Sequence, residues 1–431
     1  MNQTLKAVRG TRDLLPPETS LWNRIETSAR QVFARYNFGE IRTPIFEDTA
    51  LFARGVGEET DIVSKEMYTW EDRARAQSEK TQSLTLRPEN TAGVVRAYIE
   101  HQLGETGQLQ KLYYIGPQFR RERPQKGRFR QFSQIGAEVI GPPSAGSESP
   151  LRDAEVLEML ATLLDELGIT GWTLHLNSVG SSADRERYNQ ALRAALVPVV
   201  EQMCVDCQRR AVTNPLRVLD CKVPADQPII DTLPVIADSL DEASRAHFAL
   251  VTAALDAAGV PYTRNLRLVR GLDYYTRTTF EFTHGGLGAQ NALLGGGRYD
   301  GLSEMLGGPR APGIGFAMGE DRLVLTLQAL EAAKPGLADA FIAPLGESLN
   351  PAALALAREL RRAGLRIELG EGSFRLKKSF EAADKTACRI VILGEDELQS
   401  GILTVKTFAT GMQTKVNRAE LAAYLSTPVC E

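Results

Sequence analysis

Apolar and polar positions recur along this 431-residue chain at spacings that predict both helices and strands. Residues 18–36 place their apolar side chains on one stripe, which predicts a long amphipathic helix. Two apolar segments, 112–115 and 132–140, flank a basic stretch, and their β-rich composition predicts two antiparallel strands joined by a long loop. A further strand is expected at 39–47, where Pro44 restricts it to a sheet edge or an interface.

The pattern changes twice farther along the chain. Between about residues 185 and 260 the sequence is alanine-rich and has helical periodicity, which predicts a helical insertion. The breaker-rich stretch 331–336 closes a helix and marks a second boundary. Beyond it, strands are expected at 340–345, 365–369, 390–393, 401–408 and 412–416, and helices at 350–363, 373–387 and 418–425. The predicted fold class is therefore α/β: an α+β core at 1–330, interrupted by the insertion, and a compact unit with parallel strands at 337–431.

The composition is that of an ordinary globular protein with two or three domains. Hydrophobic residues make up 43% of the chain and charged residues 24%. The formal net charge of −4 means that local basic patches would have to meet any nucleic acid. Because the sequence shows no signal peptide and no apolar run of membrane length, we expect a cytoplasmic protein with no membrane partner.

Cysteine usage gives a weaker signal. Five cysteines, an odd number without an export signal, are expected to be reduced thiols. Cys204, Cys207 and Cys221 have metal-like spacing, but a tetrahedral zinc site needs four ligands and no fourth Cys or His lies nearby in the sequence. Free thiols are therefore the default interpretation, and structural zinc is the alternative. No metal site made of protein ligands alone is predicted.

The stretch 119–132 carries the strongest chemical signal. It contains six cations, one carboxylate and three aromatic rings. Arginine presents planar paired donors that match phosphate oxygens, and an aromatic face can stack on a nucleobase. A solvated charged hairpin is the alternative, but it would need neither Phe119 and Phe132 nor the interleaved Glu122. The stretch therefore predicts a site for a polyphosphate and a flat base.

Several segments together resemble the class II aminoacyl-tRNA synthetases. Phe119-Arg120-x-Glu122 followed by a basic loop is similar to motif 2 of that class, and residues 313–323 are similar to motif 3. Residues 268–275 and 295–302 resemble the two signature peptides of the histidyl-tRNA synthetases. With residues 8–13, the resemblance to that family runs over nearly the whole chain.

The resemblance implies both a fold and a reaction. Residues 1–330 would form a class II catalytic domain, an antiparallel sheet flanked by helices, and 337–431 an anticodon-binding domain. The activity would be ATP-dependent ligation of L-histidine to tRNA(His) through histidyl-adenylate, with release of AMP and diphosphate. ATP would act with Mg²⁺, and a homodimer would form through motif 1 at residues 39–47.

The resemblance also assigns roles to single residues. The catalytic cations would be Arg120 and Arg270, both at the α-phosphate. ATP would be bound by Arg120, Glu122, Phe132 and Arg322. Histidine would be bound by Glu89, Thr91, Gln134, Glu138, Arg270, Tyr274, Tyr275 and Tyr299, and the tRNA acceptor end by Arg123, Gln125 and Lys126. Glu138 and Tyr275 are the candidates for contacts with the two imidazole nitrogens.

Two other functions stay open at this point. The regulatory subunit of ATP phosphoribosyltransferase is a catalytically silent relative that typically lacks the anticodon-binding domain and the motif arginines, whereas this chain keeps Arg120, Arg270 and Arg322. A nonenzymatic RNA- or nucleotide-binding module could use the basic loop, but it would not need an imidazole pocket. Three positions depart from the family pattern: Asn90, Ser133 and Asp321.

Overall fold

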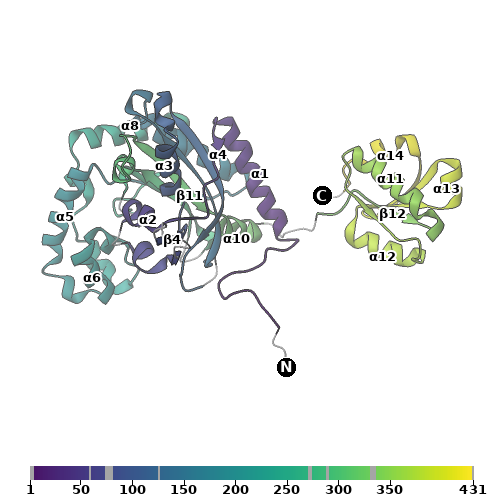
Figure 1. The fold of residues 1–431 in the computed structure, drawn as a ribbon, viewed down its shortest axis with the longest axis horizontal. Helices are drawn as coiled ribbons and strands as arrows, with labels where there is room; N and C mark the ends of the chain where they lie inside the picture. Colours follow the sequence, from purple (N-terminus) through teal and green to yellow (C-terminus); the bar gives the residue numbers. More distant parts are fainter. Residues whose placement is uncertain are drawn as a thin grey trace. The chain divides into compact units, whose positions relative to one another are not determined.

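The chain divides into two compact units, Met1–Ala333 and Lys334–Glu431, here called the first and the second unit (Figure 1). The computed structural model describes residues 4–57, 60–72, 81–124, 127–269, 274–287, 291–330 and 336–429. Each unit has its own apolar core within these residues.

A large sheet forms the centre of the first unit. Among the described residues it has eight strands in the order β1-β5-β6-β11-β10-β9-β7-β8. These are β1 (Gly39–Glu40), β5 (Gln110–Phe119), β6 (Gln131–Ile140), β7 (Trp172–Ser178), β8 (Thr263–Arg264), β9 (Thr276–His284), β10 (Ala292–Arg298) and β11 (Gly313–Gly319). Neighbours run antiparallel except at the edges, where β1 is parallel to β5 and β8 to β7. The pairing of β5 with β6, with Leu112 opposite Glu138, confirms the predicted antiparallel strands.

Four helices share one core with this sheet. They are α1 (Thr19–Arg35), α4 (Pro150–Glu166), α8 (Glu242–Ala258) and α10 (Glu320–Leu330). The buried side chains of α1 are Leu21, Trp22, Ile25, Ala29, Val32 and Phe33, so the predicted helical stripe is confirmed. Because α10 follows β11 directly and packs into this core, its first turn is held at the end of the central strand.

The segment between β7 and β9 is largely helical, as the sequence predicted. Before α8 it contains α5 (Ser182–Leu196), α6 (Val205–Thr213), α7 (Gln227–Ile230) and several 3₁₀ turns. Side chains of α5 and α6 form a second apolar cluster that includes Tyr274, Tyr275 and Tyr299. In contrast, Val251 and Leu255 of α8 join the core under the large sheet. The inserted helices therefore pack against residues that were predicted to bind histidine.

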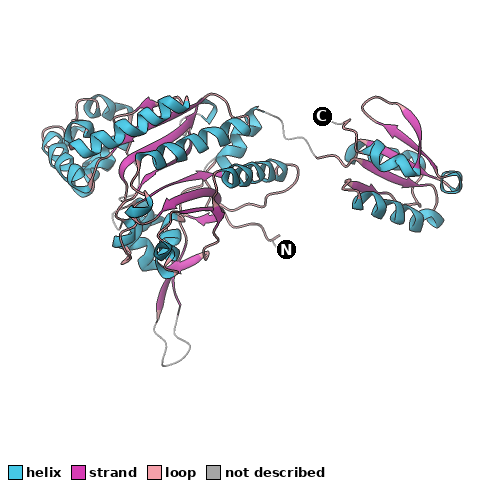
Figure 2. Cartoon of the chain, turned by 90° about the horizontal axis from the view of Figure 1, so that it is seen from above, coloured by secondary structure: helices cyan, strands magenta, loops and turns pink. Residues whose placement is uncertain are grey.

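A smaller sheet lies between α1 and β5 in the sequence. Its described strands, in the order β2-β4-β3, are β2 (Phe46–Asp48), β4 (Gln82–Leu86) and β3 (Tyr68–Asp72), and the last two form a hairpin (Figure 2). Two helices accompany it, α2 (Thr49–Val56) and α3 (Thr91–Glu100). The strand predicted at 39–47 is split by Pro44 into β1 and β2, and β1 lies at the sheet edge as expected.

The second unit is a five-stranded sheet with helices. Its order is β13-β12-β14-β15-β16, with β12 parallel to both β13 and β14, and the other pairs antiparallel. The strands are β12 (Ala340–Pro344), β13 (Ile367–Leu369), β14 (Arg389–Leu393), β15 (Ile402–Thr407) and β16 (Gln413–Asn417). The helices are α11 (Asn350–Arg362), α12 (Leu376–Thr386), α13 (Glu395–Ser400) and α14 (Arg418–Leu425). Only α13 was not predicted.

Two general predictions can be compared with the structure. None of the helices in the described ranges is long and apolar enough to cross a membrane. The expectation that all five cysteines are reduced is wrong at Cys388, which is disulfide-bonded. Cys204, Cys207 and Cys221 are free thiols.

Candidate active site

A cavity of about 340 Å³ lies against β6, β10 and β11, a volume typical of small-molecule sites. Residues that the sequence predicted as ligands line it: Glu89, Thr91, Arg120, Glu122, Phe132, Gln134, Tyr274, Tyr275, Tyr299 and Arg322. Glu138 is fully buried behind this wall. Arg123 is exposed on the loop of the hairpin. Arg270, Gln125 and Lys126 lie outside the described residues.

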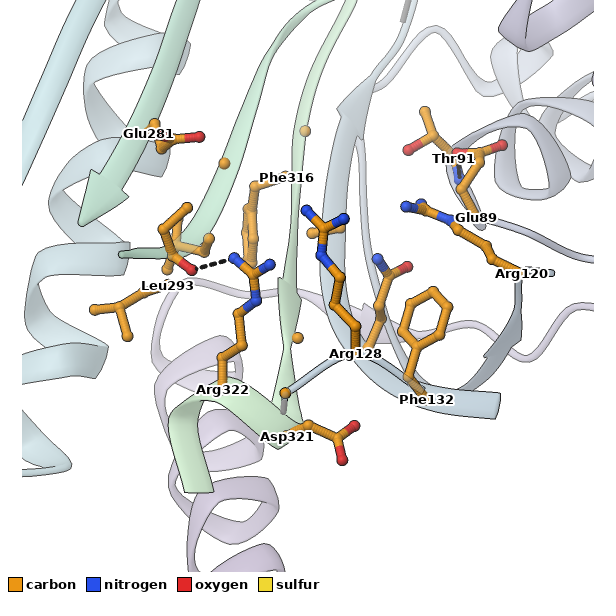
Figure 3. Close-up of a pocket in the computed structure, with 18 of the residues that line it drawn as sticks. Glu89, Thr91, Arg120, Arg128, Phe132, Glu281, Leu293, Phe316, Asp321 and Arg322 are labelled. Atoms are coloured by element: carbon orange, nitrogen blue, oxygen red, sulfur yellow. Dashed lines mark hydrogen bonds between the residues drawn. The ribbon is translucent and has the colours of Figure 1, made fainter. Parts of the chain in front are cut away.

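Arginines occupy one half of the cavity. Figure 3 shows the guanidinium groups of Arg120, Arg128 and Arg322 directed into the same space. Nη1 of Arg322 donates a hydrogen bond of 2.6 Å to the carbonyl oxygen of Ala292, and this contact fixes the side chain at the start of α10. Burial, and after it the positive charge of Arg128, lowers the pKa of Arg322. Cations that converge in this way repel one another, so this half favours a polyanion.

The base of the hairpin positions Arg120 beside an aromatic ring. The backbone N–H of Arg120 donates to the carbonyl of Arg130 at 2.9 Å, which holds the hairpin closed where β5 ends. The side-chain Nε of Arg120 donates to the carbonyl of Pro88 at 2.9 Å. Its guanidinium carbon lies 5.2 Å from the centre of the Phe132 ring. A guanidinium group and an aromatic ring, the two residues that the sequence assigned to the phosphate and the base, are thus neighbours.

Glu122 is held between two arginines of the hairpin. Arg128 Nη1 lies 3.0 Å from Glu122 Oε2, and Arg120 Nη1 lies 3.9 Å from Oε1. The Arg128 side chain is 41% exposed, so its pairing with Glu122 is weakly held. Arg128 can therefore exchange this carboxylate for another anion in the cavity.

A buried carboxyl group marks the other half of the site. Glu138 on β6 accepts hydrogen bonds of 2.7 Å from the hydroxyl groups of Thr91 and Tyr299, one at each carboxyl oxygen. Gly315 of β11 stands opposite Glu138, and a Cβ at that glycine would lie 1.6 Å from Glu138 Oε2. The glycine thus makes room for the carboxyl group. Burial raises the pKa of Glu138 to about 8, although the two hydroxyl hydrogen bonds lower it.

Glu89 lies at the beginning of α3. Its two carboxyl oxygens accept hydrogen bonds from the backbone N–H groups of Thr91 at 2.8 Å and Ala92 at 3.0 Å. Burial raises the pKa of Glu89, and these backbone hydrogen bonds oppose the shift. The helix terminus therefore fixes a carboxyl group on the wall of the cavity, where a cationic group of a ligand could pair with it.

The rest of this half is aromatic and has one open acceptor. The rings of Tyr274 and Tyr275 lie 4.8 Å apart, and those of Tyr274 and Tyr299 lie 6.0 Å apart at a steep angle. Oε1 of Gln134 is buried and accepts no hydrogen bond from the residues that the structure describes. A buried acceptor without a partner is costly, so a ligand N–H group would be bound favourably there.

Some site features were not predicted. Arg128 and Glu281 line the cavity, yet neither was assigned to ATP or histidine from the sequence, which placed Arg128 in the loop for the tRNA acceptor end. Arg128 could have been found because it belongs to the basic stretch, whereas Glu281 carries no motif signal on its strand. Asp321 accepts a hydrogen bond of 3.0 Å from Arg12, so this departure from the family pattern ties the amino-terminal segment to α10. Asn90 has a φ of −122°, a conformation that does not require glycine.

An antiparallel sheet that carries a basic hairpin and a glycine-rich strand followed by a helical arginine, all at one cavity, defines the class II aminoacyl-tRNA synthetases. A family model described as Histidyl-tRNA synthetase matches residues 10–323, and one described as Anticodon binding domain matches residues 339–427. The chain belongs to the histidyl-tRNA synthetase family.

Individual relatives agree with this assignment. A histidine–tRNA ligase of Koribacter versatilis is 73% identical over 422 residues, which are 98% of this chain and 96% of the relative. One of Solibacter usitatus is 57% identical over 423 residues, 98% of this chain and 99% of the relative. The crystal structure of apo histidyl-tRNA synthetase from S. aureus superposes with a TM-score of 0.78 at 38% identity, covering 98% of this chain and all of the other.

These similarities decide between the alternatives left open by the sequence. The ligases match over nearly their whole length, and the second unit matches an anticodon-binding domain, which the silent relative was expected to lack. The chain is an ATP-dependent enzyme that ligates histidine to tRNA, and the regulatory-subunit and binding-module interpretations are set aside.

Proposed function

We propose that the cavity binds ATP and L-histidine together and joins them as histidyl-adenylate, and that the histidyl group then passes to tRNA(His) with release of AMP. The proposal rests on one observation above all, which is the division of a single cavity into a cationic half and a half of buried carboxyl, amide and hydroxyl groups. A polyphosphate and a small zwitterion with a planar ring require these two environments side by side.

The cationic half is the proposed ATP site. The histidine carboxylate would attack the α-phosphorus, and the bond from that phosphorus to the diphosphate group would break. Negative charge then grows on the phosphorus oxygens. Arg120 would already be in place to stabilise this charge, and Arg270, which the sequence predicted for the same role, would act with it. Phe132 would stack on adenine. The Arg128–Glu122 pair would open, so that Glu122 accepts a hydrogen bond from the adenine amino group while its partner turns to the phosphates.

Arg322 is the proposed ligand of the terminal phosphate. It reaches the cavity from the first turn of α10, whereas the other two arginines belong to the hairpin. Because its Nη1 is fixed by the Ala292 carbonyl, Arg322 can hold the departing diphosphate in a defined position.

The buried half is the proposed histidine site. Glu89 would pair with the α-ammonium group. Glu138 and Tyr275 would contact the two imidazole nitrogens, and Gln134 would offer its open carbonyl oxygen. Thr91 and Tyr299 orient the Glu138 carboxyl group through their hydroxyl groups. Tyr274 packs its ring against those of its neighbours and completes the wall.

Mg²⁺ is proposed to enter with ATP. Carboxylate oxygens are the protein ligands that this ion prefers, and Glu281 and Asp321 are carboxylate residues that line the cavity. The residues present therefore fit the ion, which would neutralise phosphate charge when bound. The phosphate contacts of the arginines do not depend on it.

The tRNA would contact both units. Arg123, with Gln125 and Lys126, would meet the acceptor end, and the second unit would bind the anticodon. Removing residues 337–431 should leave adenylate formation within a few-fold and reduce aminoacylation by at least about 100-fold, because only the second step needs the tRNA. A folded truncated protein that charges tRNA at the full rate would show that the second unit has another role.

A cytoplasmic homodimer is the proposed form of the enzyme. Ile45 and Phe46, at the strand split by Pro44, are 45% and 53% exposed, and Trp70 of β3 is 41% exposed. Phe46 and Trp70 lie 6.0 Å apart, so they form one apolar patch that a second copy would cover. A mass of two chains at micromolar concentration, reduced to one chain by Phe46→Glu, would support this proposal.

The proposed chemistry is tested most directly by exchange of labelled diphosphate into ATP. Exchange should require histidine, because the reverse reaction needs histidyl-adenylate. Exchange that continues without histidine, or that another amino acid supports equally well, would show that the pocket has been assigned wrongly.

A further inference from the structure

Four potential metal ligands meet in the inserted helices, outside the cavity. They are the thiol groups of Cys204, Cys207 and Cys221 and the carboxyl group of Asp226, whose ligand atoms all lie within 4.8 Å of one another. Cys207, Cys221 and Asp226 are buried, and Cys204 is half-buried. The sequence had shown three of these residues but not the fourth, because an aspartate five positions after Cys221 carries no zinc-specific signal.

The local fold brings the four groups together from three short elements. Cys204 is the N-cap of α6, and Cys207 lies in its first turn. Cys221 directly follows the 3₁₀ helix Pro215–Asp220, and Asp226 ends the 3₁₀ helix Pro224–Asp226. An α-helix N-terminus carries partial positive charge, so it stabilises thiolates and carboxylates placed at it.

The distances match a tetrahedral site. With Zn–S bonds of about 2.3 Å and Zn–O bonds of about 2.0–2.2 Å, tetrahedral ligands lie roughly 3.5–3.8 Å apart. Here the sulfur atoms of Cys204 and Cys221 are 3.9 Å apart, and Cys221 Sγ is 3.2 Å from Asp226 Oδ2. Shifts of a few tenths of an ångström would place these three atoms around one ion.

Backbone groups hold the ligand atoms in place. The N–H of Cys204 donates to both carboxyl oxygens of Asp226 at 3.1 and 3.2 Å, and the N–H of Val223 donates to Cys221 Sγ at 3.4 Å. Hydrogen bonds of this kind orient metal ligands and stabilise their anionic forms. The cluster is therefore built to present negative ligand atoms to a shared point.

We propose that Cys204, Cys207, Cys221 and Asp226 bind one zinc ion as a structural site. Three thiolates select a soft or borderline metal rather than Mg²⁺ or Ca²⁺, and four protein ligands in a mostly buried position leave no open site for catalysis. The ion would join the start of α6 to the chain at 221–226. This part of the structure consists of short turns, which contribute little to the free energy of folding by themselves. This proposal is independent of the adenylate chemistry.

The first test is the metal content of the full-length protein, purified without chelators from cells grown with zinc. We expect about one zinc per chain. Asp226→Asn and Cys207→Ser should each lower the zinc content several-fold. Asp206→Asn is the matched control, because Asp206 lies in the same turn of α6, is 66% exposed and pairs only with Arg209 among the described residues; it should keep its zinc.

Cobalt spectroscopy tests the proposed zinc site on the unmodified protein, so the test does not depend on whether the variants fold. After the zinc is removed from the unmodified protein, one equivalent of Co²⁺ should give the strong d–d bands of a tetrahedral site and thiolate charge-transfer bands. Chelation should lower the melting temperature by at least about 5 °C, and zinc should restore it. Absence of stoichiometric zinc together with absence of tetrahedral cobalt bands would overturn the proposal, as would a disulfide between Cys204 and Cys221 in the protein as isolated.

Discussion

The two halves of the cavity use opposite electrostatic designs. In the cationic half, the guanidinium groups of Arg120, Arg128 and Arg322 are directed into one space, and guanidinium is a permanent cation among side chains. In the other half, the proposed histidine site and here called the histidine half, burial raises the pKa values of Glu89 and Glu138, the latter to about 8. One half is therefore a fixed positive field, and the other is a set of groups whose charge depends on pH and on the ligand.

This difference separates two tasks of the enzyme. A fixed field suits the chemical step, because it need not rearrange as charge grows at the α-phosphorus. Buried hydrogen-bonding groups suit discrimination, since a competing amino acid that lacks the ring nitrogens leaves them unpaired at a cost of about 1–3 kcal/mol each. We therefore expect changes in the first half to affect turnover and changes in the second to affect the use of histidine.

The largest effect is expected from Arg120→Ala. Arg120 is proposed to act where charge develops, so turnover in diphosphate exchange should fall about 1000-fold, which corresponds to about 4 kcal/mol, with a smaller change in the KM for ATP. Arg121→Ala is the matched control, because Arg121 is the exposed neighbour on the same hairpin. If Arg120→Ala kept its kcat and only raised the KM for ATP, the cationic half would be a binding site without a catalytic role. Arg270→Ala is expected to resemble Arg120→Ala.

The next effect concerns selectivity. Glu138→Gln and Tyr275→Phe should each lower kcat/KM for histidine about 100-fold and change the KM for ATP less than about threefold, because each removes one proposed partner of the imidazole ring. Glu100→Gln, on the exposed end of α3, serves as a control and should leave both constants unchanged. Equal losses for ATP and histidine in the pocket variants would contradict the division into two halves.

A smaller effect separates two arginines of one hairpin. Arg128→Ala removes a cavity cation, so the KM for ATP should rise about tenfold and depend less on salt. Arg123→Ala should leave diphosphate exchange unchanged and reduce tRNA charging about tenfold with a weaker salt dependence, because Arg123 is proposed to meet the acceptor end. Both constants are measured at two salt concentrations. Identical behaviour of the two variants would indicate that the loop does not divide its contacts between ATP and tRNA.

The cationic half of the cavity was easier to predict from the sequence than the histidine half. The arginines are concentrated in one basic stretch and one glycine-rich turn, so residue types alone indicated a phosphate site. The strands β5 and β6 and the alternating elements of the second unit were also predictable, because period-two and helical patterns reflect which side chains are buried. The second unit's α13 was missed because a helix of six residues is too short to show a periodic stripe.

The histidine half depended on resemblance to a family, and its physical basis lies in contacts between distant residues. Thr91, Glu138 and Tyr299 are far apart in the sequence, yet two hydroxyl hydrogen bonds unite them. The space for this carboxyl group comes from Gly315 on a neighbouring strand, a consequence of sheet register that no local pattern reveals. Asp226 was missed for the same reason, since its neighbours in space are three cysteines that belong to other elements of the inserted helices.

The last prediction concerns how stability depends on pH. Glu138 has an ordinary pKa of 4.5 when unfolded and about 8 when folded, so its protonated form contributes stability that is complete below pH 4.5 and is lost as the pH rises to about 8. Glu138→Gln has no proton to lose, so its stability relative to the unmodified protein should increase with pH, by up to about 1.4 kcal/mol per pH unit. The shift of Glu320 to about 8 acts in the same direction, but it is present in both proteins and cancels.

Tryptophan fluorescence can follow this unfolding selectively, because the three tryptophans, Trp22, Trp70 and Trp172, all lie in the first unit. The unfolding midpoints of the variant and the unmodified protein are measured at about pH 5.5 and at about pH 8. The difference between the two midpoints should change markedly between these two pH values. Parallel pH dependences in the two proteins would mean that Glu138 already carries its charge at neutral pH in the free enzyme. The histidine half would then hold a fixed negative charge as permanent as the positive charge of the arginines, and recognition of the imidazole would rest on ion pairing instead of proton-sensitive hydrogen bonding.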